Sequence, residues 1–443
     1  MRLQSGSIIS RDMFPVDRVV MVGQMTEARA EGTRSKKRVV LTGISTNVLV
    51  LGIVSLLTDM SSEMIYPIMP YFLVAIGSSA LLIGLIEGAA ETTASLLKVF
   101  SGWYSDRYRR RKPFILSGYS ASALAKPLFY LATSPWHVLG VRITERVGKG
   151  IRSAPRDALI ADSTEEGMRG KAYGLHKALD SAGAVIGPLL VLPILLAAAT
   201  VTEDTYRQVF LWSTIPSLAA VLVILLFVRD VESKAAAAKI GHFFKEVRSL
   251  DRSFWRLMVI VVTFYIGEIN VAFLILKASE AGIESVTTII LYVIFNVMFF
   301  LISMPAGSLS DRLGRRPVIA VSFSLLAITC MVMAYAETQY VLLLGFVIYG
   351  AYKGTSEGVL KAYVTDFVPV HARGTALGAF HTGVGLVMLP GSVIAGFLWD
   401  SVGPWATFAY GIVMSLTALT LLAVLGQEKS GMFRKGELSQ GSA

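Results

Sequence analysis

The sequence contains very little cysteine and little charge. Cys330 is the one cysteine among 443 residues, so a disulfide within the chain and a thiolate metal cluster are excluded. We interpret Cys330 as a small, buried apolar residue. Charged residues make up 16% of the chain against 54% apolar residues, and the mean hydropathy is +0.61. Such apolarity would be unusual for a soluble core and indicates a membrane protein.

Signals of enzymatic chemistry are missing as well. The pair Lys149-Gly150 lacks the upstream glycine spacing and the following Ser or Thr of a phosphate-binding loop. The sequence shows no metal-ligand spacing and no nucleophile with a base. We therefore expect no enzymatic activity, no cofactor and no bound metal. Residues 1–40 contain no apolar core followed by a small-residue cleavage site, so we expect no cleaved signal peptide.

Long apolar stretches are abundant. About 20 such residues cross a hydrocarbon layer of roughly 30 Å, and the sequence predicts twelve spans. They are 47–76, 80–101, 113–133, 136–161, 171–198, 208–228, 255–279, 285–306, 317–336, 339–366, 374–399 and 404–426.

Basic residues predict the orientation of these spans. They gather in the loop after the second span (Arg107, Arg109, Arg110, Arg111 and Lys112) and in 229–253, whereas the short loops of opposite parity contain only Arg207. Because positively charged loops stay in the cytoplasm, both termini are predicted to be cytoplasmic. The expected domains are a tail (1–43), a six-helix bundle (44–228), a cytoplasmic central loop (229–253), a second six-helix bundle (254–426) and a tail (427–443).

The same loops explain the net charge of +10. They would lie against the anionic headgroups of a lipid bilayer. The expected partners are therefore the bilayer, protons and a small-molecule substrate, and we expect no nucleic acid.

The chain repeats itself at an offset of 204 or 205 residues. The segment Gly102 to Lys112 recurs from Gly307 to Arg316. Lys149-Gly150, Asp162, Arg169-Gly170, Gly174 and Gly187 recur as Lys353-Gly354, Asp366, Arg373-Gly374, Gly378 and Gly391. Two pseudo-symmetric bundles around a central site are typical of secondary transporters, so the repeat favours transport over chemistry.

With these residues in view, the chain resembles the major facilitator superfamily from about Asn47 to Leu425. One signature is the GxxxDRxGRR pattern, which in the family is similar to a latch that holds the outward-open state. Its residues here are Gly102, Asp106, Arg107 and Arg110, with Arg109 in place of the second glycine, and Gly307, Asp311, Arg312 and Arg315 in the second copy.

The resemblance implies an all-α membrane protein with twelve transmembrane helices in two pseudo-symmetric six-helix bundles. Such a protein would work by alternating access, as a monomer, as a multi-pass protein of the inner membrane of a prokaryote.

Span four carries a second signature. Arg146-Val-Gly-Lys149-Gly150 is similar to the family's RxxQG element, with Lys149 in place of glutamine. A rise of about 1.5 Å per residue puts Arg146 roughly 15 Å deep. Arg142, Glu145, Arg146, Lys149 and Arg156 recur every three or four residues and form one polar stripe. Charges at that depth must face a partner or a wet cavity.

Asp59 and Glu63 on span one are the first candidates for proton coupling. They lie four residues apart on one face, at a depth comparable to that of Arg146, so we predict a contact between Arg146 and Asp59 or Glu63. Intramembrane carboxylates are functional candidates by default, and structural pairing alone is the alternative. Glu87 and Glu91 on span two form the second candidate pair, with Lys98 two turns below.

A third signature lies on span five. Gly174, Gly183 and Gly187-Pro188 match the first part of an element that is associated with antiporters in the family. The closing glycine pair is replaced by Val191 and Leu192, which weakens the inference of antiport. Small residues at this spacing predict tight helix packing, and Pro188 can bend the span.

We expect a central cavity that both halves line with polar groups. Besides the acidic pairs, the candidates are Arg142, Glu145, Lys149, Lys126, His176, Asp180, Glu268, Asn270, Lys353, Glu357 and Lys361. Aromatic residues in spans more often pack or face lipid, so Tyr66, Tyr265, Tyr292, Tyr349 and Phe273 rank low as substrate contacts.

Two functions stay open at this stage. Proton-coupled export (antiport) of small organic compounds is supported by the partial antiporter element and the acidic pairs. Proton-coupled transport of an anionic metabolite, a carboxylate or phosphorylated compound, is supported by the basic residues on spans three, four and ten. The two differ in whether these basic side chains meet the substrate or are consumed by internal pairing. A non-transporting membrane sensor is a weaker third reading, because fold does not fix function.

Overall fold

The computed structural model describes residues 45–108, 110–231, 246–369 and 372–426. The chain divides into two units, Met1–Thr46 and Asn47–Ala443, and the packing considered below lies within the second. The predicted tails, 1–43 and 427–443, and residues 232–245 of the predicted central loop lie outside the described residues.

A first group of helices precedes residue 232, and we call it the N-terminal half. It contains α2 (Thr46–Ile65), η1 (Tyr66–Ile68), α3 (Met69–Ala75), α4 (Ala80–Tyr108), α5 (Lys112–Ala125), η2 (Lys126–Phe129), α6 (Pro135–Asp162), η3 (Glu166–Met168), α7 (Arg169–Ala197) and α8 (Glu203–Phe227).

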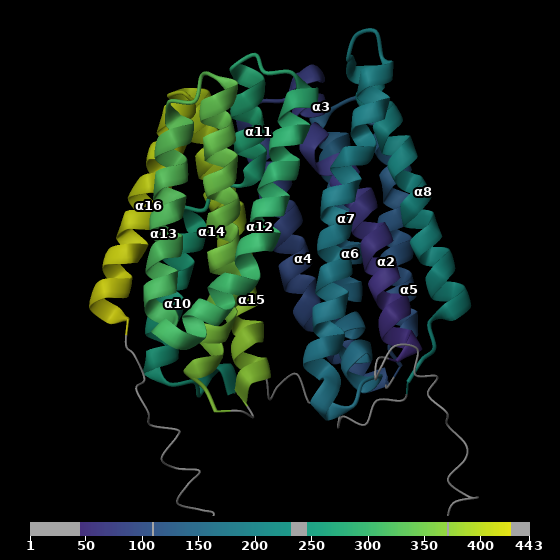
Figure 1. Cartoon of the computed structure of the whole chain (residues 1–443), viewed down its shortest axis with the longest axis vertical. Coiled ribbons are helices and arrows are strands. Elements are labelled where there is room, and N and C mark those ends of the chain that lie inside the picture. Colours follow the sequence, from purple (N-terminus) through teal and green to yellow (C-terminus); the bar gives the residue numbers. More distant parts are fainter. Residues whose placement is uncertain (1–44, 109, 232–245, 370–371, 427–443) are drawn as a thin grey trace, which may run out of the picture. The chain divides into compact units, whose positions relative to one another are not determined.

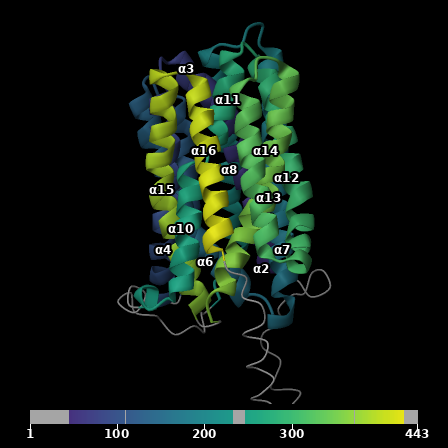
Figure 2. The ribbon, with the colours of Figure 1, turned by 90° about the vertical axis from the view of Figure 1, so that its left-hand side faces the viewer.

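A second group follows residue 245, and we call it the C-terminal half. It contains α10 (Arg252–Ile266), α11 (Val271–Glu280), α12 (Ser285–Leu313), α13 (Arg315–Ala334), α14 (Gln339–Asp366), α15 (Arg373–Ser401) and α16 (Pro404–Leu425). Figure 1 shows the two groups side by side, and Figure 2 faces the C-terminal half, with α15, α16 and α13 toward the viewer.

The predicted spans correspond to helices of the structure. Within the described residues, nine helical segments are long and apolar enough to cross a membrane. The other three predicted spans correspond to α5 with η2, α6 and α14. The helix α5 is short, and α6 and α14 are more polar because they carry charged stripes. Two helices, α4 and α12, run past their predicted ends to Tyr108 and Leu313, so both latch motifs begin inside a helix.

The first helix of each half is interrupted near its middle. In the N-terminal half, Pro67 and Pro70 lack the backbone N–H that an α-helix needs, and the short helix η1 joins α2 to α3. In the C-terminal half, the break lies between Ile266 and Val271, where the Asn270 side chain accepts a hydrogen bond from the Ala272 N–H and caps α11. Both breaks lie beside the central cavity described below, since Tyr66, Glu268 and Asn270 line it.

The two halves pack on each other along α4 and α15 and along α7 and α12. Glycine allows the closest approaches: a Cβ at Gly88 would lie 2.9 Å from the Leu389 Cα. The side chain of Asp400, at the end of α15, accepts hydrogen bonds from the N–H groups of Ala80 (3.0 Å) and Leu81 (2.9 Å), and so caps α4 across the interface.

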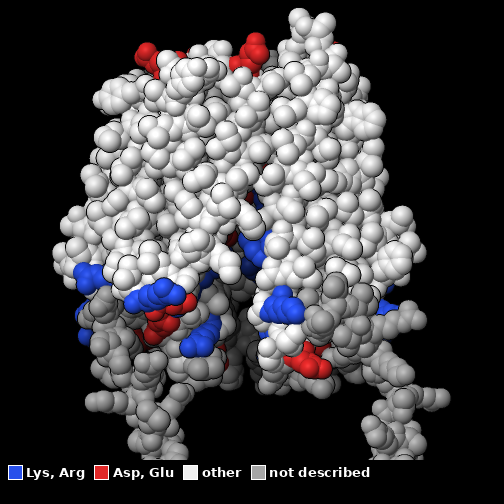
Figure 3. Space-filling view, in the orientation of Figure 1, with Lys and Arg blue, Asp and Glu red and all other residues white. Residues whose placement is uncertain are grey.

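The helical unit has two unlike ends. We call the end with Arg110, Arg111 and Gly314 the charged end, and the end with loops 76–79, 281–284 and 402–403 the opposite end. Lys and Arg gather at the charged end, and a cleft opens there between the halves, with charged groups visible inside it (Figure 3). Toward the opposite end the halves are joined, for example by Tyr71, whose hydroxyl donates to the Ile283 carbonyl at 2.8 Å.

Candidate functional site

The polar stripe of α6 faces α4 inside the N-terminal half. Arg142 is 1% exposed. Its guanidinium donates to both oxygens of Glu87 at 3.2 Å and to Glu145 Oε2 at 2.8 Å. It also lies over the Tyr66 ring, 5.2 Å from the centroid. Three of its five N–H groups are thus engaged within the protein and two carboxylates balance its charge, so Arg142 is poorly placed to bind an anionic substrate.

Arg146 forms an ion pair with Glu91 at 3.2 Å. The predicted contact of Arg146 with Asp59 or Glu63 is therefore wrong. The reason is the packing of α4 on α6, where a Cβ at Gly150 would touch Leu97 and Ala94. Glu87 and Glu91 are four residues apart, as are Arg142 and Arg146, so a second pair forms one turn below the first.

Asp59 and Glu63 have other partners. Glu63 accepts a hydrogen bond from the Tyr292 hydroxyl at 2.7 Å, which joins α2 to α12 of the other half. Asp59 faces α7, where a Cβ at Gly183 would lie 3.2 Å from the Asp59 Cβ. The two carboxylates on α2 therefore belong to two different contacts, one between the halves and one within the N-terminal half.

The C-terminal half carries a matching ion pair at its helix break. Lys353 on α14 pairs with Glu268, and its ammonium lies 5.8 and 5.6 Å from the ring centroids of Tyr349 and Tyr352. Lys353 is the repeat of Lys149, as the sequence offset predicts. Glu268 is 8% exposed, and among the described atoms its second oxygen, Oε2, has no hydrogen-bond partner. That oxygen can accept a hydrogen bond from a bound molecule.

These groups surround a cavity of about 190 Å³ between the two halves. The lining residues are Tyr66, Glu87, Gly88 and Glu91 from the N-terminal half, and Tyr265, Glu268, Asn270, Val271, Tyr349, Lys353, Met388 and Ser392 from the C-terminal half. Two of these lining residues are joined across the halves, because the Tyr66 hydroxyl donates a hydrogen bond to Asn270 Oδ1 at 2.8 Å. Five of the residues that the sequence singled out as coupling or cavity candidates line this cavity: Glu87, Glu91, Glu268, Asn270 and Lys353.

Tyrosines are the part of the lining that sequence reasoning ranked too low. Tyr66, Tyr265 and Tyr349 all line the cavity. Of the other two aromatic residues, Tyr292 bonds to Glu63 and Phe273 packs on Trp399. The positions of the helix breaks indicate which tyrosines line the cavity, because Tyr66 and Tyr265 lie next to them in the sequence.

Other candidates lie away from this lining. Lys126 is fully buried beside α2, where it donates to the hydroxyls of Ser61 (2.5 Å) and Ser62 (3.2 Å). On α7, His176 is buried and Asp180 pairs with Lys177. On α14, Lys361 pairs with Glu357 at 3.2 Å. Lys149 is exposed. The structure does not place these side chains in one site with the cavity residues.

The latch motifs show one arginine that the sequence undervalued. Arg111 is 2% exposed and donates to Ser105 Oγ at 2.7 Å and to Asp162 at 3.5 Å. Arg315, which the motif aligns with Arg110, makes the matching contacts with Ser310 and Asp366 and also pairs with Asp311 at 2.5 Å. We interpreted Arg111 as a topology-setting charge, yet it ties the end of α4 to the end of α6.

The other latch residues lie at the charged end of the molecule, and most of their charged side chains are exposed. Arg107 and Arg110 are exposed, and the Arg107 guanidinium lies 5.8 Å from the Trp103 ring. A Cβ at Gly102 would lie 3.2 Å from the Ala154 Cβ, whereas no atom of the described structure lies within 4 Å of one at Gly307. Arg312 is exposed as well, and the side chain of Asp106 lies outside the described part.

The glycines of α7 pack against α2. A Cβ at Gly183 would lie 2.5 Å from the Leu56 carbonyl oxygen, and one at Gly187 would lie 2.9 Å from the Glu63 Cβ. Pro188 follows inside the helix. At Gly174 the surrounding space is open. Tight packing thus applies to the second and third glycines of the motif and not to the first.

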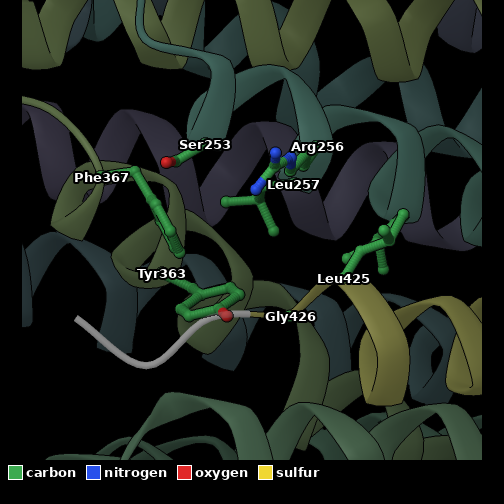
Figure 4. A pocket seen from close by; sticks show the side chains of 8 residues that line it. Ser253, Arg256, Leu257, Tyr363, Phe367, Leu425 and Gly426 are labelled. Carbon is green, nitrogen blue, oxygen red and sulfur yellow. The ribbon is translucent and has the colours of Figure 1, made fainter. Parts of the chain in front are cut away.

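A second pocket lies at the charged end of the C-terminal half (Figure 4). Its lining includes Ser253 and Arg256 from α10, Tyr363 from α14 and Leu425 from α16, and its volume is about 10 Å³. That is close to the least space that a single water molecule needs. It is too small for a substrate.

Comparisons with known proteins agree with this architecture. The profile of the Major Facilitator Superfamily matches residues 51–276 and 257–438. An uncharacterized MFS-type transporter of Methanocaldococcus jannaschii is 35% identical over 388 residues, which cover 86% of this chain and 94% of that protein. The class H tetracycline resistance protein of Pasteurella multocida is 22% identical over 85% of this chain and 95% of its own.

Solved structures share the fold. A nucleoside transporter, NupG, covers 86% of this chain and 100% of its own with a TM-score of 0.73 at 14% identity. The human organic anion transporter MFSD10 covers 85% and 99% with a TM-score of 0.62 at 18% identity. The resemblance and the all-α membrane fold predicted from the sequence are therefore confirmed, and the chain belongs to the Major Facilitator Superfamily, a family of secondary transporters and not of enzymes.

Proposed function

We propose that this transporter couples protons to the export of small organic compounds that carry a cationic or uncharged polar group. One observation carries the proposal: the central cavity is lined by three carboxylates, Glu87, Glu91 and Glu268, and by a single lysine or arginine, Lys353. The arginine partners of Glu87 and Glu91 do not belong to the lining, so a bound molecule meets carboxylate oxygens first, which attract a cation and repel an anion.

Internal pairing consumes the basic residues around the cavity. Arg142 is held by Glu87 and Glu145, Arg146 by Glu91, and Lys353 by Glu268. Pairing was the criterion that separates the two functions left open by the sequence, and it favours organic compounds over anions. The tyrosine rings of the lining add apolar area and faces that attract cations.

The state of the structure fits the loading step of an exporter. The cleft opens at the charged end (Figure 3), and we place this end in the cytoplasm because Lys and Arg gather there. In the inner membrane of a prokaryote, cytoplasmic compounds would then enter the cavity directly. The similarity to a tetracycline resistance protein supports export.

Proton coupling needs a carboxylate whose charge changes as the protein cycles. Glu91 lines the cavity and its partner Arg146 lies on a separate helix. A cationic substrate beside Glu91 would compete with a proton there, because both neutralise the same charge. Because the proton and the substrate cannot both occupy this position, their competition alone is enough to exchange one for the other.

Transport of an anionic metabolite is the second candidate. Lys149 favours it, because this exposed lysine has no ion pair within the described residues. One structural neighbour is an organic anion transporter. A single lysine outside the lining is weaker support than the carboxylate surplus of the cavity itself.

The test uses inside-out membrane vesicles that hold a pH gradient. A panel of cationic, neutral and anionic compounds is added in turn, and the collapse of the gradient is followed with a fluorescent dye. We expect cationic or neutral compounds to collapse the gradient, and Glu91→Gln to reduce the response at least tenfold. A response to anionic compounds alone would reverse the proposal in favour of the second candidate.

A further inference from the structure

The break between α10 and α11 carries two polar side chains with free hydrogen-bonding groups beside the cavity. Glu268 is 8% exposed, and its Oε2 has no hydrogen-bond partner among the described atoms. Two residues later, the amide nitrogen of Asn270, Nδ2, donates no hydrogen bond within the part of the chain that the structure describes. Both residues line the cavity. One short segment of the C-terminal half therefore presents a free acceptor and a free donor.

The orientation of the Asn270 amide is fixed by contacts from both halves. Its Oδ1 accepts hydrogen bonds from the Ala272 N–H at 2.9 Å and from the Tyr66 hydroxyl at 2.8 Å. A backbone N–H can only donate, so the group that faces Ala272 must be the amide oxygen and not the amide nitrogen. Nδ2 therefore lies on the other side of the amide, with both of its N–H groups available.

The charge of Glu268 is already balanced. Lys353 pairs with its Oε1, and the same ammonium lies near the rings of Tyr349 and Tyr352. A second cation at Oε2 would be repelled by Lys353, so this oxygen suits an uncharged donor better. The terminal torsion of a glutamate side chain is soft, and Oε2 can turn toward a bound group while Oε1 keeps Lys353. A hydroxyl fits both free groups at once, because it can donate one hydrogen bond and accept another.

We propose that Glu268 and Asn270 form a hydroxyl-binding subsite and that the transported compound is a small amino alcohol. Its hydroxyl donates to Glu268 Oε2 and accepts from Asn270 Nδ2. Its ammonium faces Glu87 and Glu91, which line the cavity from α4 of the other half. The inference rests on the proposed function, and it names the class of compound and the residues that select it.

The size of the cavity limits the rest of the compound. Its volume of about 190 Å³ is below the roughly 300–1,000 Å³ that is usual for drug-sized ligands. It would hold roughly six water molecules at about 30 Å³ each. Tyr66 and Tyr265 supply aromatic rings from the two halves, and such rings pack well on a second ring. A single phenyl group with an amino alcohol chain matches this space.

Isothermal titration calorimetry on the purified full-length protein in lipid nanodiscs tests the subsite without a pH gradient or transport. The first probe, 2-amino-1-phenylethanol, carries the ring, the hydroxyl and the amine. The second, 2-phenylethylamine, lacks only the hydroxyl, and the third, mandelate, has a carboxylate in place of the aminomethyl group. We expect the amino alcohol to bind at least about tenfold more tightly than 2-phenylethylamine, because the missing hydroxyl would leave buried polar groups unpaired. Mandelate should bind most weakly.

The variant Asn270→Gly removes the amide donor, and glycine is tolerated at the start of a helix. The preference for the amino alcohol should disappear in this variant. Asn270→Ser, with a side chain too short to replace the amide, should behave in the same way and keeps a cap on α11. Thermal unfolding checks that both variants are folded. Asn47→Gly is the matched control, because Asn47 bonds to Ser163 and Arg229 outside the lining, and the preference should remain in it.

The outcomes separate this inference from the proposed function. Equal binding of the two amines to the wild type would overturn the hydroxyl subsite and leave the proposed function intact. A preference that survives in both Asn270 variants would overturn it as well. Mandelate that binds most tightly, and loses affinity in Asn270→Gly, would support the subsite and contradict a cationic cargo. If none of the three probes binds, the proposed class of compound is wrong.

Discussion

At the scale of single residues, Arg142 is the buried charge that depends most on its partners. Its side chain is almost fully buried and is held by two carboxylates. Removing one member of such a group leaves an uncompensated charge in a medium of low dielectric constant, which costs far more than the intact group contributes. The network therefore constrains substitution even where it takes no part in transport.

We expect Arg142→Gln to destabilise the protein by about 3 to 5 kcal/mol, because Glu87 and Glu145 would then lack a partner. Thermal unfolding in detergent measures the loss, and the double variant Arg142→Gln/Glu87→Gln should recover part of it. The control is Lys361→Gln, which breaks the exposed pair with Glu357 on α14. Loss of such a surface pair should cost about 0 to 1 kcal/mol. Equal losses in the two single variants would contradict this account.

The sequence predicted which residues of the site carry charge, and it failed on their partners. The polar stripe of α6 follows from helical periodicity, and Glu87, Glu91, Glu268 and Lys353 do line the cavity. Depth alone could not assign Arg146 to Glu91 over Glu63, because depth says nothing of how a helix is rotated. That rotation is set by close packing between α4 and α6, where Gly150 meets the apolar residues Leu97 and Ala94.

At the scale of helices, the glycines of α7 decide how closely it packs on α2. The Met60 carbonyl oxygen occupies the space that a Cβ at Gly187 would need. Helix pairs in membranes gain most of their stability from such close packing of small residues. A methyl group here would separate the two helices and with them the side chains that they hold together.

We expect Gly187→Ala to lower the melting temperature of the purified protein, because the added methyl group meets backbone atoms that cannot move aside. The cost of such overpacking is about 1 to 3 kcal/mol. Gly174→Ala on the same helix is the matched control: nothing in the described structure lies within 4 Å of its added carbon, so we expect little change or a slight gain. Unfolding followed by tryptophan fluorescence compares the two, and an equal response would argue against the packing explanation.

The breaks in the first helix of each half show where sequence reasoning about elements stopped. The first break could be expected from the sequence, because Pro67 and Pro70 interrupt the hydrogen bonding of a helix. The second break, at Gly267 to Asn270, contains no proline, and a continuous span was predicted there. Its cause is tertiary: the Tyr410 hydroxyl bonds to the Ile266 carbonyl and Tyr349 to that of Ile269. Those partners take up backbone groups that a continuous helix would have used.

At the scale of the whole helical unit, the cap that Asp400 places on α4 belongs to one state only. It joins the halves at the opposite end, so it must break when the protein opens there. Its free energy therefore affects the balance between the two states of the transport cycle and not only the stability of the fold.

We expect Asp400→Ala to shift this balance by about 1 kcal/mol, roughly fivefold, toward the state that is closed at the charged end. Spin labels at Gly170→Cys and Gly374→Cys report the distance between the halves, in a Cys330→Ser background. Both positions are exposed at the charged end. The short-distance population should rise in Asp400→Ala and stay constant in Asp204→Ala, an exposed control in the first turn of α8. A constant population in both would contradict a role of the cap in closure.

The buried ion pairs also bear on how the chain enters the membrane during synthesis. Within the described residues, the paired cations of α6 and α14 beside the cavity have carboxylate partners earlier in the sequence: Glu87 and Glu91 precede Arg142 and Arg146, and Glu268 precedes Lys353. As the chain emerges from its N-terminus, α4 is already made when the charged helix α6 leaves the ribosome. The translocation machinery can thus release α6 against a neighbour that neutralises it, and Arg142 and Arg146 do not have to wait in lipid for partners still to be translated.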